Sequence, residues 1–220
     1  GNGIDFGDLS EDLAAMATMS SSTRGIVAGG DPGPATTNLI EYVEINTLGN
    51  TQDFGDLSQL RINAGACSSS TRALWGGGSS PGGTPRNTVD YNTISSLGNA
   101  IDFGDLSQSY ANTAGGSNSI RGLFSLGEGI WGDVNTIDYF TIATTGNWVD
   151  FGDRSQATHK DAAVTSPTRL VFGGGSVSPA YTNVMEYVQI MTTGNAVDFG
   201  DILADNASPS HCSNGHGGLG

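Results

Sequence analysis

The chain has 220 residues and a net charge of −14 at pH 7, with Lys160 as its single lysine. Such an acidic chain repels nucleic-acid phosphates and anionic membranes, which makes both poor partners. No run of about 18 apolar residues is present, so the sequence predicts no membrane insertion. The 34 glycines indicate many tight turns, and the apolar residues recur in phase as in a folded domain.

One short segment returns along the whole chain. It reads Asp-Phe-Gly-Asp, and successive copies are 48, 49, 48 and 48 residues apart. The copies begin at Asp5, Asp53, Asp102, Asp150 and Asp198. Self-similarity at one period is the signature of a repeat architecture. We therefore expect a single domain over 1–220, with repeats at about 1–48, 49–97, 98–145 and 146–193 and a partial repeat at 194–220.

Each period contains four predicted strands, as its second copy shows. Residues 64–68 and 73–77 are the first two, residues 87–94 the third and residues 100–106 the fourth. One strand and its turn every 12 residues or so is the spacing of all-β folds. No window keeps a 3.6-residue apolar period, so helix is expected to be nearly absent.

Other residue types keep the same phase. An arginine ends the turn before the second strand, an acid–tyrosine pair lies in the third, and Gly-Asn precedes the fourth. The arginines are Arg24, Arg72, Arg121 and Arg169. We expect each to bond a carboxylate of its own or the next unit, although a role in ligand binding is the alternative. The repeated tyrosines and phenylalanines are predicted to be core.

The acid pairs of the Asp-Phe-Gly-Asp copies have two interpretations. Two carboxylates in each copy are suitable ligands for calcium. Alternatively, each aspartate accepts backbone or arginine hydrogen bonds at a turn while the phenylalanine packs between units. Repetition in every copy favours the structural role, so no cofactor or metal is expected and calcium is the alternative.

The order of these motifs resembles kelch repeats. Gly29-Gly30, Gly76-Gly77 and Gly173-Gly174 end the second strands, the acid–tyrosine pair follows, and an aromatic residue lies in the fourth strand. The third copy departs from the pattern with Ser125-Leu126-Gly127, and phenylalanine replaces the usual fourth-strand tryptophan. The resemblance implies a β-propeller of four-stranded blades, with four full units and a split fifth.

A narrower resemblance is to kelch-like repeats in structural and tail-associated proteins of marine tailed phages. Ser21-Ser22-Thr23-Arg24-Gly25, Ser69-Ser70-Thr71-Arg72 and the Asp-Phe-Gly-Asp-Leu segments carry it. This resemblance implies a virion-associated role.

The two ends of the chain suggest how a ring would close. Residues 1–10 hold one fourth strand and residues 204–220 hold a first strand, so we expect the two segments to pair and complete a fifth blade. This closure would hide strand edges that otherwise invite aggregation. That blade would lack a third strand, which leaves a longer chain with more blades, or closure by a partner chain, as alternatives.

Cysteine and histidine provide little chemistry. Cys67 and Cys212 lie three periods apart, on non-adjacent units, and are expected to be buried thiols. His211, Cys212 and His216 form the only close group of soft metal ligands, but their spacing matches no standard zinc site.

The copies differ most in two kinds of connection, between the second and third strands and between one unit and the next. In four-stranded up-and-down units, both kinds lie on one face, and binding residues often lie on variable loops of a rigid scaffold. The residues of this face that the repeat does not explain are Arg61, Arg86, Tyr110, Trp131, His159, Lys160 and Tyr181. They are the candidate binding residues, and unconstrained drift of the loops is the alternative.

No catalytic motif stands out from the repeat, so an enzyme is not expected. The resemblance to the phage repeats implies a structural or attachment propeller on a phage virion, as part of the tail, a fibre or the capsid decoration. It would bind virion or surface proteins, or a glycan, through the variable face, and it is a candidate homo-oligomer. The alternative is a cellular or secreted, extracellular kelch-type module for protein interaction.

Overall fold

The computed structural model describes residues 2–33 and 35–208. All regular structure in this part of the chain is β-structure, and it contains no helix that is long and apolar enough to cross a membrane. Four antiparallel sheets follow one another along the sequence, each built on four strands, and we call them units one to four. The expectation of an all-β fold is confirmed.

The units repeat the same strand order. Unit one contains β1 (Ala17–Ser20), β2 (Arg24–Gly30), β3 (Thr37–Glu44) and β4 (Gln52–Asp56). Unit two contains β5 (Gly65–Ser68), β6 (Arg72–Gly76), β7 (Arg86–Thr93) and β8 (Ile101–Ala111). Unit three contains β9 (Ala114–Ser117), β10 (Arg121–Ser125), β13 (Thr136–Thr141) and β14 (Val149–Asp153). Unit four contains β15 (Ala162–Thr165), β16 (Arg169–Gly173), β19 (Val184–Gln189) and β20 (Val197–Asp201).

Two short hairpins interrupt units three and four between their second and third main strands. The first is β11 (Glu128–Gly129) with β12 (Gly132–Asp133), and the second is β17 (Ser176–Val177) with β18 (Ala180–Tyr181). The β11 strand pairs with the long β8 of unit two, so this hairpin extends the sheet of the preceding unit to six strands.

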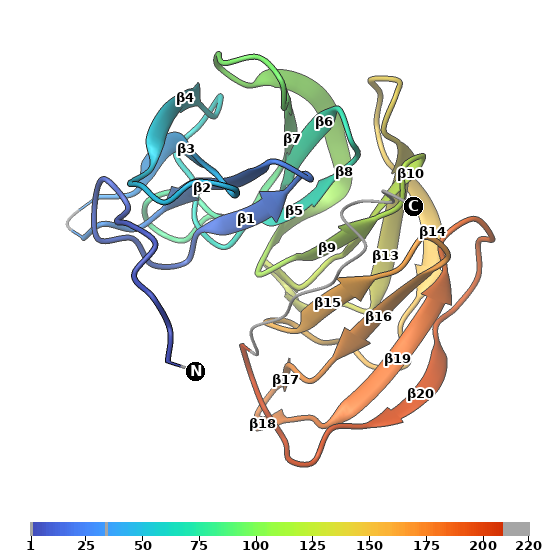
Figure 1. Cartoon of the computed structure of the whole chain (residues 1–220). Helices are drawn as coiled ribbons and strands as arrows, with labels where there is room; N and C mark the ends of the chain where they lie inside the picture. Colours follow the sequence, from blue (N-terminus) through green and yellow to red (C-terminus); the bar gives the residue numbers. More distant parts are fainter. Residues whose placement is uncertain (1, 34, 209–220) are drawn as a thin grey trace.

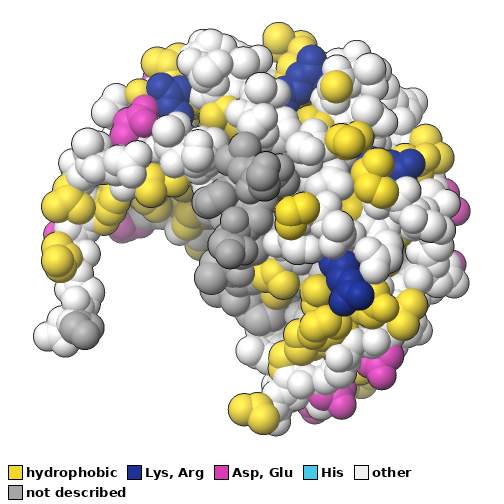
Figure 2. All heavy atoms as spheres, turned by 45° about the vertical axis from the view of Figure 1, so that its right-hand side comes forward, with side chains coloured by type: hydrophobic (Ala, Val, Ile, Leu, Met, Phe, Trp, Pro, Cys, Tyr) yellow, Lys and Arg dark blue, Asp and Glu magenta, His cyan; other side chains and the backbone are white. Residues whose placement is uncertain are grey.

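The four units stand side by side in an open arc, with their first strands β1, β5, β9 and β15 on the inside (Figure 1). The fourth strands lie on the outside of the arc. The space-filling view shows a wide opening between the N-terminal segment and unit four (Figure 2). The described residues therefore form a partial ring.

Apolar residues fill the spaces between neighbouring units. One cluster joins Ile26 and Phe54 of unit one to Trp75 of unit two, and the next joins Leu74 of unit two to Phe124 of unit three. A third cluster joins units three and four. Because each unit is one sheet thick, it buries its two faces only by packing against neighbours, as expected for a repeat array.

In the described residues, the expected pairing between the two ends of the chain is not formed. Residues 2–10 make no hydrogen bond to residues 204–208, and instead bind the turn of unit one that precedes β4. The remainder of the predicted pairing, residues 209–220, lies outside the described residues. The sheets themselves cover 17–56, 65–111, 114–153 and 162–201, so each one straddles an expected repeat boundary.

Candidate functional site

The repeated Asp-Phe-Gly-Asp segment joins each unit to the next. The phenylalanine carbonyl of one unit accepts a hydrogen bond from the glycine N–H of the following Gly-Asn turn, as Phe54 does from Gly98 at 2.8 Å. The backbone N–H of Asp56 donates to Oδ1 of Asn99 at 3.2 Å. The same bonds join Phe6 to Gly49, Phe103 to Gly146 and Phe151 to Gly194. We call this contact the latch.

A bulge in every fourth strand produces the latch. In unit one, Asp53 pairs with Glu41 and Gly55 pairs with Ile40, which leaves Phe54 without a partner in its own sheet. The unpaired carbonyl is free to accept from the next unit, as bulges commonly redirect one residue. The corresponding irregularity occurs between β7 and β8, β13 and β14, and β19 and β20.

Each repeated arginine lies over the tyrosine of its own unit. Arg72 is 4.7 Å from the ring centroid of Tyr91, and its Nη1 donates to the Ile142 carbonyl of the next unit at 2.8 Å. Arg24 and Arg121 repeat both contacts. Within the described residues, Arg24 alone among the four has a carboxylate partner, Glu44 at 2.8 Å. The expected arginine–carboxylate pairs are thus replaced by cation–π stacking and bonds to backbone carbonyls.

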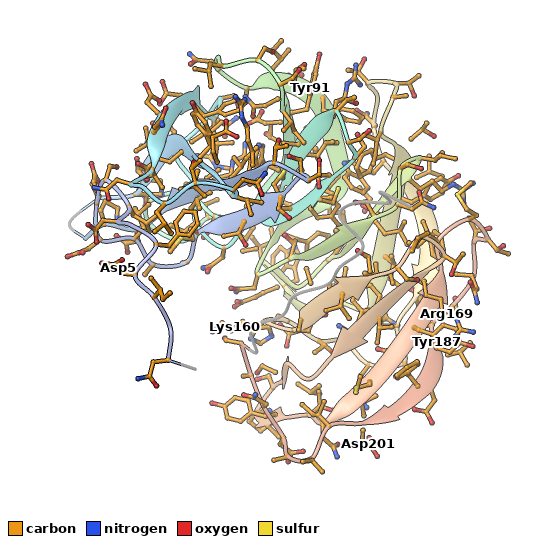
Figure 3. The ribbon with its side chains drawn as sticks, viewed as in Figure 1. Asp5, Tyr91, Lys160, Arg169, Tyr187 and Asp201 are labelled. Atoms are coloured by element: carbon orange, nitrogen blue, oxygen red, sulfur yellow. The ribbon has the colours of Figure 1, made fainter. Side chains whose placement is uncertain are left out.

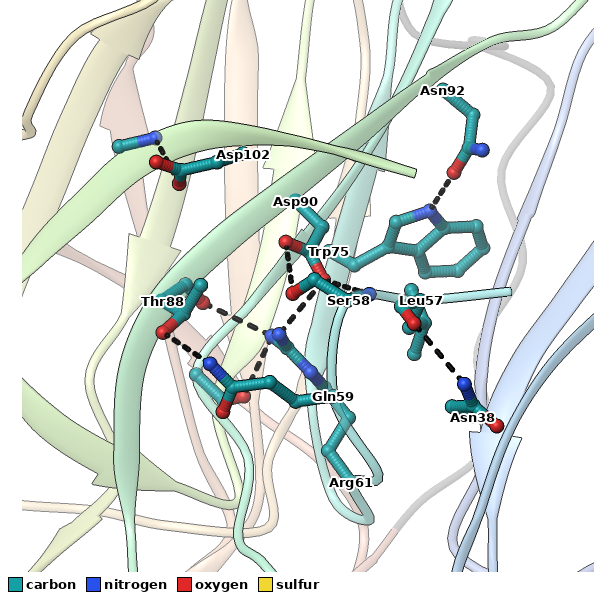
Figure 4. A network of polar contacts seen from close by, with 12 residues as sticks. Asn38, Leu57, Ser58, Gln59, Arg61, Trp75, Thr88, Asp90, Asn92 and Asp102 are labelled. Atoms are coloured by element: carbon teal, nitrogen blue, oxygen red, sulfur yellow. Dashed lines mark hydrogen bonds and ion pairs between the residues drawn. The ribbon is translucent and has the colours of Figure 1, made fainter. Parts of the chain in front are cut away.

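The acid of the acid–tyrosine pair is buried in all four units. Asp90 accepts hydrogen bonds from the backbone and hydroxyl of Ser58, two residues after the preceding fourth strand β4. Arg61 lies beside it, with Nη2 at 2.9 Å from the carboxylate and Nη1 donating to the carbonyls of Gly77 and Thr88 (Figure 4). Arg61 is fully buried, so its prediction as a surface binding residue is wrong.

In unit four the buried acid Glu186 is also paired with an arginine, but this arginine comes from another position in the repeat. Arg154 binds Glu186 at 2.7 Å and Asp161 at 2.5 Å, and all three side chains are buried. Sequence reasoning missed Arg154, although a signal was present. The position holds Leu57 in unit one and Leu106 in unit two, so the arginine breaks the repeat.

Asp138 in unit three has no such cation among the described residues. Its Oδ2 accepts from the Ser107 backbone at 2.8 Å, while its Oδ1 is buried without a hydrogen-bond partner. Burial raises the pKa of the Asp138 carboxyl, and the bonds from Ser107 offset part of this rise. Burial also raises the pKa of the nearby Tyr110 hydroxyl, and the charge of Asp138 adds to the effect.

We expect Asp138→Asn to be more stable, relative to wild type, at pH 7 than at pH 4. A carboxyl whose folded pKa is raised above 3.8 binds more protons in the folded state. Stability of the wild type therefore falls as pH rises from about 4 through the folded pKa, and the asparagine variant lacks this loss. Chemical denaturation at both pH values measures the difference. Exposed Glu11→Gln is the control, and equal curves for Asp138→Asn and wild type would contradict the assignment.

The two kinds of variable connection do lie on one face. The segment that leads into each first strand forms a β-bridge with the connection between the second and third strands of the same unit. The bridges are Ala14 with Asp31, Ile62 with Ser79, Tyr110 with Gly129, and His159 with Ser176. The variable face is therefore continuous along the arc.

Trp131 is the most exposed aromatic residue on this face, with 94% of its surface accessible. It lies next to Ile130 at the tip of the β11–β12 hairpin, where a two-residue loop joins Gly129 and Gly132. The hairpin borders a hollow of about 180 Å³, which Gln108, Ser109 and Val134 also line. Sequence reasoning singled out Trp131 but missed Ile130 and Gln108, because the sequence of this connection differs from copy to copy.

The hairpin has contacts on both sides. Nδ1 of His159, in the connection that leads into unit four, lies 2.9 Å from Oδ1 of Asp133. Nδ2 of Asn112 donates to Glu128 at 2.9 Å on the side of unit two. An exposed indole on an anchored hairpin loses little conformational freedom when it binds a partner.

The other candidate residues are spread over the face. Lys160 lines a separate hollow of about 230 Å³ at the inner side of the arc, together with Asn63 and Asn112 (Figure 3). Tyr181 is exposed on the β17–β18 hairpin. Arg86 is half-buried in β7 and pairs with Tyr110. Tyr110 itself is buried beneath the β11–β12 hairpin, so it lines the hollow without being an accessible residue.

No cluster of three or more His, Cys, Asp or Glu side chains suited to a metal ion occurs in residues 2–33 and 35–208. Cys67 is a buried free thiol, and burial raises its pKa. The group of His211, Cys212 and His216 lies outside the described residues. The aspartates of the latch serve the backbone, as Asp102 accepts from Gly104 at 3.1 Å.

No protein-family model matches the sequence, and a search of curated proteins returns no match.

Proposed function

We propose that this chain is a binding scaffold of kelch-like β-propeller blades, used for structure or attachment on a phage virion, and that it acts without catalysis. The four one-sheet units with inner first strands support the propeller architecture. Motif order and the Ser-Ser-Thr-Arg segments support the kelch-like and phage assignments. Localisation on a virion, with an extracellular module as the alternative, is part of the same proposal.

The repeated residues and the residues of the variable connections have different roles, and this difference supports binding through the variable face. Repeated residues such as Phe54, Arg72 and Asp90 make hydrogen bonds between units. Trp131 is almost fully exposed and lies at the tip of a hairpin in a connection whose sequence differs between units. Exposed tryptophans are typical anchors of binding surfaces.

The lining of the hollow favours a carbohydrate as the ligand. The flat indole of Trp131 offers an apolar surface to the C–H face of a sugar ring. Gln108 and Ser109 beside it supply donors and acceptors for ring hydroxyls. The strong negative charge of the chain favours neutral or basic glycans over acidic ones.

We expect Trp131→Ala to weaken glycan binding at least tenfold, about 1.4 kcal/mol or more, because hot-spot tryptophans carry much of the binding energy. The stability of the variant should stay within about 0.5 kcal/mol of wild type, since the side chain is exposed. A microarray of bacterial surface glycans, followed by titration of the strongest signal, measures the loss.

Leu97→Ala is the matched control, because Leu97 is also an exposed apolar residue but lies between the third and fourth strands, away from the variable face. Retained binding by Trp131→Ala would contradict the proposed site. If a pull-down from host-cell surface extract recovers proteins and no glycan binds, the ligand is a protein and the glycan assignment is wrong. Immunogold labelling of the 79–86 loop on virus particles tests the virion assignment, and label confined to cells would contradict it.

A further inference from the structure

Unit four presents one half of the contact that joins the other units, and no described residue occupies the other half. Its latch segment, residues 198–201, repeats the Asp-Phe-Gly-Asp sequence in the same bulged strand. Phe199 is 51% exposed, whereas Phe54, Phe103 and Phe151 are 2–3% exposed. A Cβ at Gly200 would meet nothing within 4 Å, whereas at Gly55 it would lie 2.5 Å from the Gly98 carbonyl.

Arg169 completes the half of the contact that unit four presents. It stacks on Tyr187 at 4.6 Å, as the other repeated arginines do on their tyrosines, and the two side chains lie together on unit four (Figure 3). Arg24, Arg72 and Arg121 also bind the carbonyls of Ile94, Ile142 and Ile190 in the following unit. Arg169 has no following unit to bind among the described residues.

Unit one presents the complementary half. Ile45 occupies the place of Ile94, Ile142 and Ile190, yet it is 42% exposed where they are 0–3% exposed. No arginine binds its carbonyl in the described part of the chain. The neighbouring Gly49-Asn50 turn is occupied by residues 5–8 of the same chain, which copy the latch without belonging to a sheet.

We propose that two copies of this chain associate head to tail, with the β20 face of each copy docked on unit one of the other. Asp198–Asp201 would replace residues 5–8 on the Gly49-Asn50 turn, and Arg169 would bind the Ile45 carbonyl. This inference rests on the proposed propeller architecture, because two-fold pairing of the open arcs then closes a ring of eight blades. Residues 5–8 act as a built-in competitor that limits association.

The exchange of latch segments is close to neutral, because the displacing and displaced segments have the same four residues and make the same backbone bonds. The net gain comes from groups that residues 5–8 do not supply. It consists of the Arg169 bond, the burial of Ile45 and Phe199, and the contact between two sheet faces. The gain would favour association at high protein concentration.

Sedimentation equilibrium of the full chain over a wide concentration range tests this proposal. We expect a reversible species of twice the chain mass. Phe199→Ala should raise its dissociation constant at least tenfold, because the docked ring is buried. Phe6→Ala should lower the dissociation constant, because it weakens the competing segment. Phe6 and Phe199 occupy equivalent repeat positions, so their opposite effects distinguish this contact from general hydrophobic association.

Arg169→Ala provides a second variant in case Phe199→Ala alters the fold, which the thermal midpoint of each variant reports. A chain that stays monomeric at every concentration, or a dimer that neither Phe199→Ala nor Arg169→Ala weakens, would overturn the proposal. Polymers longer than the dimer would overturn the closed ring. Glycan binding through Trp131 is measured separately, so failure of the assembly and failure of the proposed function are distinguishable.

Discussion

Replacing Arg61 by methionine is expected to lower the free energy of unfolding by about 3–5 kcal/mol, because it leaves a buried carboxylate without its cation. Arg61 and Asp90 have no accessible side-chain surface, and the guanidinium also binds the carbonyls of Gly77 and Thr88. Methionine fills a similar volume, so the loss reports the charge and hydrogen bonds more than packing. Urea denaturation followed by tryptophan fluorescence gives the value.

The control for this change is Glu44→Gln, which removes the partner of Arg24 in a partly exposed ion pair. Pairs of this kind contribute about 0–1 kcal/mol, so the control should change stability little. Similar losses for Arg61→Met and Glu44→Gln would contradict the assignment of Arg61 as a buried structural residue. A large loss for Arg61→Met alone would explain why this arginine is unsuited to ligand binding.

Replacing Gly104 by alanine is expected to destabilise the protein by at least 2 kcal/mol more than replacing Gly200, on the order of the cost of overpacking. A Cβ at Gly104 would lie 2.4 Å from the Gly146 carbonyl of the next unit, while one at Gly200 would meet no atom within 4 Å. Both glycines have positive φ, +146° and +131°, so backbone strain is common to both variants.

The difference between the two alanine variants therefore isolates the close approach of two units at the latch. Thermal and chemical denaturation of both proteins, at a concentration at which wild type sediments as a monomer, measures it. Equal destabilisation would show that the glycine is required only for its backbone conformation. In that case the latch would not need the close packing that the structure shows.

The strands were predictable because two short signals repeat in phase. The expected third strand at residues 87–94 is β7 at Arg86–Thr93, and the expected second strand at 73–77 is β6 at Arg72–Gly76. The acid–tyrosine pair and the Gly-Asn turn lie at the same positions in each sheet. Strands assigned in one repeat can therefore be placed at the equivalent residues of the other repeats. The same repetition indicated correctly that Phe54, Phe103 and Phe151 lie in the core, but it was wrong for Phe6 and Phe199, which are exposed.

The candidate site was predictable only in part, because its residues do not repeat. Arg61 and Tyr110 lie in variable segments, yet their side chains turn inward, one to bind Asp90 and the other beneath the β11–β12 hairpin. In a segment whose sequence does not repeat, the direction of a side chain depends on contacts with distant residues. The spacing of residue types does not reveal these contacts. Trp131 could be identified as a candidate binding residue because it does not occupy a position of the repeated core.

The carboxylate partners expected for the arginines illustrate a different limit. The pattern placed an arginine and an acid in every unit, and it was natural to pair them. In the structure the acid is bound by the backbone of a serine in or just after the preceding fourth strand. Arg72 and Arg121 instead stack on a tyrosine ring and donate to an isoleucine carbonyl. Co-occurrence in a repeat indicates that both residues are structural, but it does not identify their partners.

Hydrogen exchange of the free protein at single-residue resolution tests most directly the central claim that the repeated residues join the units. We predict slow exchange of the amide protons of Gly98, Gly146 and Gly194, which donate to the phenylalanine carbonyls of the preceding units. The amides of Ile130 and Trp131 at the hairpin tip should exchange much faster. Fast exchange at the three latch glycines would contradict the claim, since the units would then not be joined there.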